Sequence, residues 1–214
     1  TLGGKITATG GAGAADTNAG GAGGVVTLVA ASGAITINDV IDVGGGAGTG
    51  PSAANGGAGG TLQLKSTGGT ITQSAEIKGA GGAASAGGGT AGSDGKLKVE
   101  SNDAVTLAHA SNNFGTVVAK LTTASKAFKY NDTNTLTVGQ VGAFGTDFTS
   151  DGLGNASQAS MDDITTNGGA VVVKTGGTLT TTVTTGDIVT TGATGNPGAA
   201  GGEVFLNSGG AITL

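Results

Sequence analysis

The chain of 214 residues contains no cysteine, no arginine and no tryptophan, and it has only two prolines, five phenylalanines and one tyrosine. Without cysteine the chain can form neither a disulfide framework nor a thiolate metal site. The missing arginine argues against recognition of nucleic acid, anionic lipid or phosphate, which depends heavily on the guanidinium group. The sequence also has no run of 18 apolar residues, so it predicts no membrane-spanning helix.

Glycine is the most conspicuous residue, with 47 copies. Together with proline it approaches the composition of low-complexity, disordered chains, and disorder is one interpretation. Disordered chains, however, are usually poor in hydrophobic residues and high in net charge. This chain is 36% hydrophobic and 11% charged, with a net charge of -5. We therefore expect a folded protein that buries small and β-branched side chains in thin layers.

Residues 25–60 carry the clearest pattern, in which apolar residues alternate with polar or small ones. Alternation predicts short strands with one buried face, because successive side chains of a strand point to opposite sides. The next stretch repeats the pattern 36 positions later, pairing Val26 with Leu62, Leu28 with Leu64, Ile35 with Ile71, and Ile41 with Ile77. Three strands followed by a glycine-rich insert thus form one unit, and the unit recurs.

The two ends of the chain match complementary parts of this unit. Residues 1–24 resemble a third strand with its insert, and residues 203–214 resemble a first and second strand, with Val204, Leu206, Ile212 and Leu214 inward. Joined across the termini, the two ends complete one unit. We expect the chain to be one period of a longer tandem array or a subunit that docks head to tail, with chance complementarity as the alternative.

The units between the ends vary. Residues 96–115 keep two strands without an insert, and residues 116–139 offer strands near 117–121, 127–130 and 136–138. Residues 140–170 are the least regular. Regularity returns over residues 170–202, which gives about seven units in all. In the irregular stretch we expect the inward residues to be Phe144, Phe148, Met161 and Ile164.

A repeated order of strand, turn, strand, turn and strand predicts one coil of a right-handed parallel β-helix. A coil cannot bury its own apolar face, so the coils must stack. We therefore expect residues 1–214 to form a single all-β solenoid of about seven coils. A flat antiparallel sandwich is the alternative, although it leaves the repeated order of three unequal strands without a reason.

Glycine-rich inserts follow the third strand at about residues 10–24, 44–60, 79–95 and 192–202. We expect them to leave the solenoid at the same corner and to lie beside one another. Chain with almost no side chains allows backbones to approach closely, so the inserts can form a layer of polyproline-II-like segments bonded through their peptide groups. Flexible surface loops are the equal alternative.

Most of the aromatic residues fall where the inserts are absent. We expect Phe114, Phe128, Tyr130, Phe144 and Phe148 to stack in the core, where aromatic side chains bury a large area per residue. An exposed aromatic strip that binds sugars is the functional alternative.

Residues suited to catalysis are few, and we expect no enzyme, no catalytic residues, no cofactor and no metal. His109 is the sole histidine and reads as a strand-face residue. Asp162 and Asp163 are adjacent and would point to opposite faces of a strand. Asp39 and Asp42 lie at a turn, where aspartate commonly bonds its own backbone, and a calcium site is the alternative.

Two glycine-rich motifs are loose matches only. Gly79, Gly81 and Ala84 fit a dinucleotide fingerprint, but no helix is expected after them to bind phosphate. Residues 10–16 approach a calcium-binding nonapeptide, but Asp16 falls one position late. Neither motif predicts a ligand.

Residues 111–139, SNNFGTVVAKLTTASKAFKYNDTNTLTVG, resemble the repeats of bacterial giant exoproteins and adhesins of the filamentous-haemagglutinin type, many of which use two-partner secretion. The opening Asn-Phe-Gly and closing Leu-Thr-Val-Gly carry the resemblance, and residues 168–191 and 201–214 are similar. The resemblance implies a right-handed β-helix, export, and a role in adhesion or as an extracellular fibre. The family's amino-terminal secretion domain is not represented, and the long glycine-rich inserts depart from the ordinary short coil.

These observations lead to one main functional hypothesis and two alternatives. The main hypothesis is a structural fibre or stalk of the bacterial surface whose partners are copies of itself or continuous repeats, with no nucleic-acid partner and no membrane insertion. The first alternative is an adhesin for surface glycans, with sites on residues 140–165 or on the inserts. The second is ice binding through threonines such as those of residues 178–185, although threonines that scatter along the sequence argue against a regular array.

Overall fold

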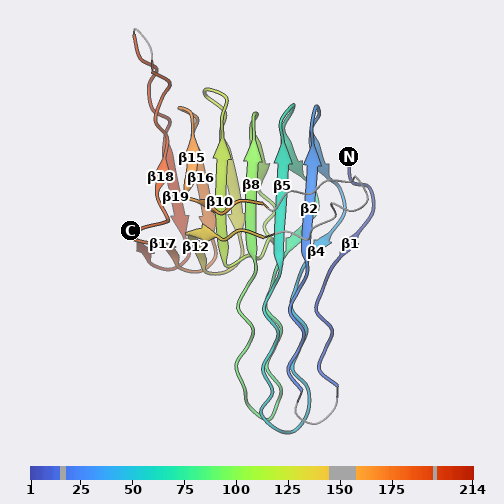
Figure 1. Ribbon diagram of the computed structural model, residues 1–214. Coiled ribbons are helices and arrows are strands. Elements are labelled where there is room, and N and C mark those ends of the chain that lie inside the picture. The colour runs from blue at the N-terminus through green and yellow to red at the C-terminus, as the bar shows by residue number, and fades with distance from the viewer. Residues whose placement is uncertain (15–17, 145–157, 195–196) are drawn as a thin grey trace.

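The computed structural model describes residues 1–14, 18–144, 158–194 and 197–214. These residues form strands, turns and extended segments, and they contain no helix. The strands stand side by side as successive rungs, with long glycine-rich loops projecting beyond one end of the strands (Figure 1). No described segment is therefore a helix long and apolar enough to cross a membrane.

The largest sheet, called the large sheet below, has nine parallel strands. Its main path runs β2-β5-β8-β10-β12-β17-β20, and β15 and β18 continue from β10 on a side branch. The strands are β2 (Val25–Ala30), β5 (Thr61–Ser66), β8 (Lys96–Ser101), β10 (Thr116–Leu121), β12 (Leu136–Val138), β15 (Ile164–Thr166), β17 (Leu179–Thr181), β18 (Ile188–Val189) and β20 (Ile212–Thr213).

Two further parallel sheets complete the stack. The second sheet has six strands, in the order β19-β16-β11-β9-β6-β3, and the small sheet has the order β1-β4-β7. The second sheet contains β3 (Ile35–Ile37), β6 (Ile71–Gln73), β9 (Val105–Leu107), β11 (Phe128–Asp132), β16 (Val171–Thr175) and β19 (Val204–Ser208). The small sheet contains β1 (Ile6–Thr7), β4 (Ile41–Asp42) and β7 (Ile77–Lys78).

The predicted 36-residue register is confirmed in all three sheets. Val26 pairs with Leu62 and Leu28 with Leu64 in the large sheet, Ile35 pairs with Ile71 in the second, and Ile41 pairs with Ile77 in the small sheet. The pairings in the stack are parallel, which contradicts the antiparallel sandwich. The antiparallel pair of the described chain, β13 (Gln140–Val141) with β14 (Met161–Asp162), lies outside these sheets.

The interior is a column of aliphatic side chains, one layer per rung, as the alternation predicts. Leucine, isoleucine and valine residues from the large and second sheets fill it, many of them with no exposed surface. Phe114, Phe128 and Tyr130 are buried in the same column, so the core prediction is confirmed for these three aromatics. It is wrong for Phe144, which is half-buried on a projecting segment, and Phe148 lies outside the described residues.

The order of strands changes at β10, and here the prediction from the sequence is wrong. The first half of β10 pairs with β12 and its second half pairs with β15, so two short strands replace one long one. β12 therefore lies in the large sheet and is not a third strand. The same shift places β19 in the second sheet and β20 in the large sheet, whereas the sequence pattern predicted a first and a second strand there.

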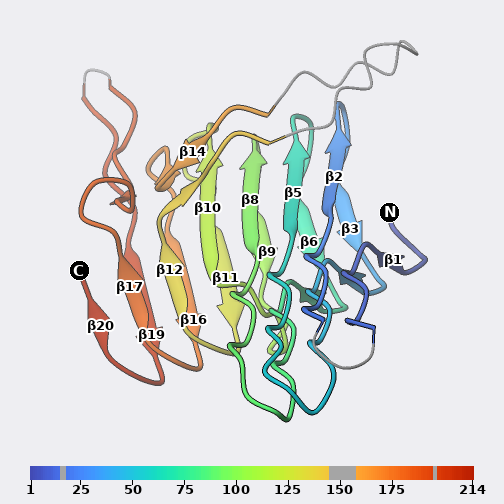
Figure 2. The same cartoon turned by 60° about the horizontal axis from the view of Figure 1, so that its bottom comes forward.

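The glycine-rich inserts at residues 10–24, 44–60 and 79–95 lie beside one another, and together they are called the glycine block below (Figure 2). Each insert has an outgoing and a returning segment, and neighbouring segments are joined by peptide hydrogen bonds that recur every third residue. On the outgoing side Gly10 and Gly13 donate to Gly44 and Ala47, and Gly45 and Gly48 donate to Ala80 and Ala83. On the returning side Gly20 and Gly23 donate to Asn55 and Ala58, and Gly56 and Gly59 donate to Thr90 and Ser93.

A step of three residues is that of a polyproline II helix. The prediction of a packed layer is therefore confirmed, and the alternative of flexible surface loops is not. A second set of bonds joins the two layers in one continuous series. In this series the N–H of each glycine donates to the carbonyl oxygen of the next, in the order Gly92, Gly82, Gly57, Gly46, Gly21 and Gly11. The fourth insert, near residues 192–202, follows β18 and projects from the opposite end of the strands (Figure 1). The prediction of a common corner is therefore wrong for this insert.

Candidate functional site

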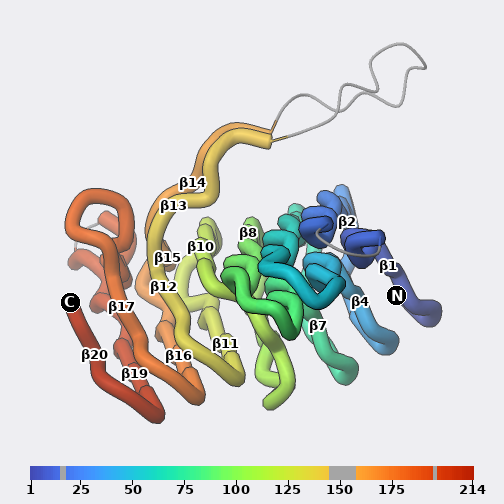
Figure 3. The backbone as a smooth tube through the Cα atoms, turned by 90° about the horizontal axis from the view of Figure 1, so that it is seen from below, coloured from blue at the N-terminus to red at the C-terminus, as the bar shows by residue number. Residues whose placement is uncertain are grey.

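The region with the most unusual polar environment is the outer face of the large sheet, beneath a projecting segment. This segment, called the arm below, consists of residues 140–144 and 158–162. It enters at the break between β12 and β15 and lies across the face of the sheet (Figure 3). It therefore interrupts what would otherwise be one continuous strand.

The arm buries a row of outward-facing side chains. Gln63, Lys98 and Val118 occupy the same position on β5, β8 and β10, and they are 0%, 3% and 0% exposed. Val141 of the arm is 1% exposed and, like Val118, lies outside the interior column. The arm thus builds a second, small apolar contact on the outer face of the large sheet.

Polar contacts fix the arm over this row. Lys98 Nζ donates to the carbonyl oxygen of Ala159 at 2.7 Å and lies 5.6 Å from the ring centroid of Phe144. Gln63 Nε2 donates to Gln158 Oε1 at 2.8 Å. The Phe144 and Gln158 backbones bond to each other in both directions, at 3.1 and 2.7 Å. Since a buried ammonium needs such partners, Lys98 ties the arm to the sheet.

Glu100 supplies the counter-charge for this lysine. Its carboxylate lies 3.3 Å from both Lys98 Nζ and Lys65 Nζ, and it accepts from Gln63 Nε2 at 3.2 Å. Burial acts to raise the pKa of Glu100, but the two ammonium groups outweigh burial and hold the pKa below its ordinary value of 4.5. Glu100 therefore carries its negative charge at neutral pH.

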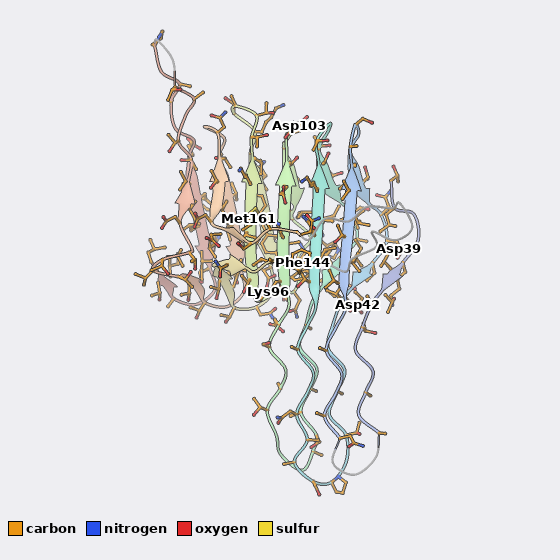
Figure 4. The ribbon with its side chains drawn as sticks, in the orientation of Figure 1. Asp39, Asp42, Lys96, Asp103, Phe144 and Met161 are labelled. Atoms are coloured by element: carbon orange, nitrogen blue, oxygen red, sulfur yellow. The ribbon has the colours of Figure 1, made fainter. Side chains whose placement is uncertain are left out.

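A groove of about 250 Å³ lies between the arm and the glycine block. It is made from the returning glycine segments, the first residues of β5 and β8, and the start of the arm. Figure 4 shows Phe144 over the face of the large sheet, with Lys96 nearer the end that carries the glycine block. The lining residues are Ala58, Gly59, Thr61, Ser93, Asp94, Lys96, Val141, Gly142, Ala143 and Phe144. The groove thus joins the two regions that the sequence pointed to separately, residues 140–165 and the inserts.

A chain of polar side chains joins the edge of the groove to the core. Asp94 accepts from the Gly81 N–H at 2.8 Å, where no further glycine loop is present to do so, and from Asn134 Nδ2 at 2.6 Å. The Asn134 N–H donates to Asp132, which also accepts from Tyr130 Oη and the Phe114 N–H. Asp94 therefore caps the last outgoing segment of the glycine block and, through Asn134, links it to β11 of the second sheet.

Burial is the largest influence on the pKa values of the two titratable core residues in this series of side chains, Tyr130 and Asp132. It raises the pKa of Asp132 above its ordinary value, against the hydrogen bonds from Tyr130, Asn134 and Phe114. Burial and the adjacent Asp132 carboxylate raise the pKa of Tyr130 well above its ordinary value. The Tyr130 hydroxyl thus keeps its proton and donates a hydrogen bond to Asp132.

The other residues singled out in the sequence do not converge on one site. His109 lies in the turn after β9, where its Nδ1 accepts from the Ser111 N–H at 3.2 Å, so the strand-face prediction is wrong. Asp162 accepts from Gln140 Nε2 at 2.8 Å, and Asp163 accepts from the Asp187 N–H at 2.8 Å. The two adjacent aspartates therefore have separate partners. The expectation that they lie on opposite faces of one strand is wrong, because Asp163 follows β14 in a bend with a φ of 69°.

The predicted turn aspartates bond their own backbone. Asp39 accepts from the Val40 N–H at 2.7 Å, and Asp42 accepts from the Gly44 N–H at 2.9 Å. Gly79 lies against the Phe114 ring at the base of the glycine block, and Asp16 lies outside the described residues. In the described ranges no group of three or more histidine, aspartate or glutamate side chains is placed to hold a metal ion.

Threonines that scatter in the sequence come into register in the structure. Thr137, Thr180 and Thr213 occupy successive rungs of the large sheet, and Thr36, Thr72 and Thr106 do so in the second sheet. They face outward, since their neighbours Leu136 and Leu179, or Ile71 and Val105, are buried. Each row thus has one threonine per rung, in single file.

Sequence reasoning missed the arm contact and Lys98. Little signal was available, because Lys98 is one of two lysines at outward positions of the alternating Lys96–Ser101 strand and looks like an ordinary exposed residue. Val118 gave a second signal, because it stands at an outward position of β10 between two inward residues. Comparison of the chain with protein-family models, curated proteins and solved structures gives no match.

Proposed function

We propose that the chain is a segment of an extracellular fibre or stalk of the bacterial surface, built as a right-handed parallel β-helix. The main path of the large sheet, β2-β5-β8-β10-β12-β17-β20, supports about seven coils. A right-handed course is the hand that parallel crossover connections almost always take. The likeness of residues 111–139 to exported giant exoproteins supports a location outside the cell. The role is structural and involves no reaction.

One observation carries this proposal, the exposure of core positions on the last rung. Val171 and Leu179 have no exposed surface, whereas their partners one rung further, Val204 and Ile212, are 47% and 45% exposed. These inward side chains have the apolar character of a core but lack a covering layer. An uncovered layer of this kind, with unpaired strand edges, favours stacking of another coil.

The two ends of the stack offer matching strands. The large sheet begins with β2 and ends with β18 and β20, and the second sheet runs from β3 to β19. Stacking a second copy, or a continuing repeat, would extend both sheets with the same parallel direction. Because of the shift at β10, the last strands β19 and β20 lie in the second and the large sheet. The join between two copies therefore differs from the one expected from the sequence, in which they would be a first and a second strand.

Electron microscopy of the purified chain at increasing concentration tests the proposal. Each chain contributes about 34 Å of rod at about 4.8 Å per rung, so rods several times longer should form. Ile212→Asp places a charge on the uncovered layer and should stop growth. Thr213→Asp, which points outward from the same strand, is the matched control and should leave rods intact. Discrete particles at every concentration, or equal rods from Ile212→Asp, would reject the proposal.

The threonine ladders favour ice binding as a second candidate function. Threonines at about 4.8 Å intervals present methyl and hydroxyl groups in a regular row, which is the kind of surface that can order water. A gap between the melting and freezing points of a solution of the chain would support this function. A chain that shows no such gap, at concentrations where it is folded, does not bind ice.

A further inference from the structure

We propose that the groove between the arm and the glycine block binds a short neutral glycan of one or two sugar rings. The proposal goes beyond the structural role above, because it assigns a ligand to the side of the rod and does not involve its ends. It rests on the shape of the groove, on unused hydrogen-bonding groups and on one aromatic ring.

Three polar side chains in the groove lack a partner in the described part of the chain. They are the hydroxyls of Thr61 and Ser93 and the ammonium group of Lys96. Thr61 and Lys96 are register partners on β5 and β8, so they lie side by side. By contrast, the Asp94 carboxylate, the Lys98 ammonium group and the Gln63 Nε2 atom already have hydrogen-bond partners. Donors and acceptors that converge without partners are what a hydroxyl-rich ligand requires.

Phe144 supplies the apolar part of the groove. A sugar ring has a face of C–H groups and a rim of hydroxyls, so an aromatic side chain beside hydroxyl and ammonium groups matches both parts. Phe144 is half-buried, and its backbone is held by the two hydrogen bonds to Gln158. The ring is therefore positioned before a ligand arrives.

The wall opposite the arm is equally fixed. Gly59 donates to the Ser93 carbonyl at 2.8 Å, which holds the second and third glycine loops together at the groove. Asp94 is held by Gly81 and Asn134. A prearranged site lowers the ordering cost of binding. The groove volume of about 250 Å³ lies just below the usual range for ligand sites, about 300–1,000 Å³, which limits the ligand to one or two rings.

Charge favours a neutral sugar. The groove contains one carboxylate, Asp94, and one ammonium group, Lys96, so its formal charge is balanced. The whole chain carries -5, which disfavours the approach of an acidic sugar. Hydroxyl recognition by Thr61, Ser93 and Lys96 therefore defines the ligand class.

The test uses an array of neutral mono- and disaccharides (glucose, galactose, mannose and their N-acetylated forms) beside glucuronic and sialic acid, followed by calorimetric titration of the best neutral ligand. Lys96→Gln, Ser93→Ala and Phe144→Leu should each weaken binding about tenfold, as expected for one lost contact. Lys174→Gln, an exposed lysine on β16, is the control and should bind as the parent chain does.

Three outcomes would overturn the assignment. They are no binding of any neutral sugar, binding of acidic sugars alone, and neutral-sugar binding that is unchanged in a triple Thr61→Val, Ser93→Ala and Phe144→Leu variant. Retained rod formation by the triple variant would show that the groove and the ends of the rod act separately. A failure of glycan binding therefore leaves the structural proposal to its own test.

Discussion

The N–H of Gly57 donates to the carbonyl oxygen of Gly46 at 2.8 Å and ties the returning half of a glycine-rich loop to its outgoing half. Gly46 in turn donates to Gly21 of the preceding loop at 2.8 Å. Backbone contact of this kind leaves no room for a side chain. The abundance of glycine in this chain is thus a packing requirement of the glycine block.

We expect Gly46→Ala to disrupt the glycine block. A Cβ at this position would lie 2.0 Å from the Gly11 carbonyl oxygen, closer than any real contact. The substitution should lower the free energy of unfolding by about 3 kcal/mol, the upper part of the usual range for overpacking. Hydrogen exchange should also become fast at residues 44–60 and 79–95.

Gly11→Ala is the matched control, because nothing lies within 4 Å of a Cβ there. It should change stability little and leave exchange in the glycine block slow. Equal protection of the parent chain and Gly46→Ala would contradict the packed arrangement of the loops.

Tyr130→Phe should destabilise the protein in a pH-dependent way. The folded protein holds the Asp132 proton more tightly than the unfolded chain, so ionisation of Asp132 lowers stability as the pH rises from 3.8 through the raised pKa. Without the Tyr130 hydroxyl the Asp132 carboxylate loses a donor, and its pKa rises further. We expect a loss of about 1–3 kcal/mol at pH 7 and a smaller loss below pH 3.8.

Urea unfolding of the parent chain and the variant at both pH values measures this difference. Phe128→Leu, which removes packing from the same strand but no hydrogen-bond donor to Asp132, should lower stability equally at both pH values. A Tyr130→Phe loss that does not depend on pH would show that the hydroxyl contributes nothing to Asp132.

Lys98→Met should loosen the arm. The substitution keeps the apolar stem but removes the donor to Ala159 and one counter-charge of Glu100, so the pKa of Glu100 should rise toward 4.5. Amide exchange at Val141 and Phe144 should accelerate about tenfold or more, as expected for one lost charged hydrogen bond. Lys65→Met, which removes the other, more exposed partner of Glu100, should have a smaller effect.

Acid should loosen the arm of the parent chain in the same way. Glu100 has a lowered pKa in the folded state, so its contribution is complete above 4.5 and is lost as the pH falls through the lowered pKa. Exchange at Val141 that stays constant across this range would mean that Glu100 does not hold the arm.

The periodic part of the fold could be predicted from the sequence, because each strand there carries its own signal. Val26 and Leu62, or Ile41 and Ile77, are apolar at the same position of equal-length units, so their pairing follows from length and alternation. The packed inserts were one of two equal expectations, since composition shows that backbones can approach but does not show that they bond.

The shift at β10 could not be predicted from local pattern. From the alternation around them, Leu136 would belong to the third strand of one unit and Ile164 to the first strand of the next. Only the pairing of both strands with β10 shows that they share one rung. Lys98 and Phe144 meet through a tertiary contact between segments distant in the chain. No pattern within one strand indicates such a contact, so the groove could not be predicted from the sequence.

Cryo-electron microscopy of rods grown from the chain tests the central claim most directly. The account predicts an uninterrupted layer spacing of about 4.8 Å that continues across each junction between chains, with strands parallel on both sides. Junctions that interrupt the layers, or rods whose chains touch through the glycine block or the arm and leave Val204 and Ile212 uncovered, would contradict it.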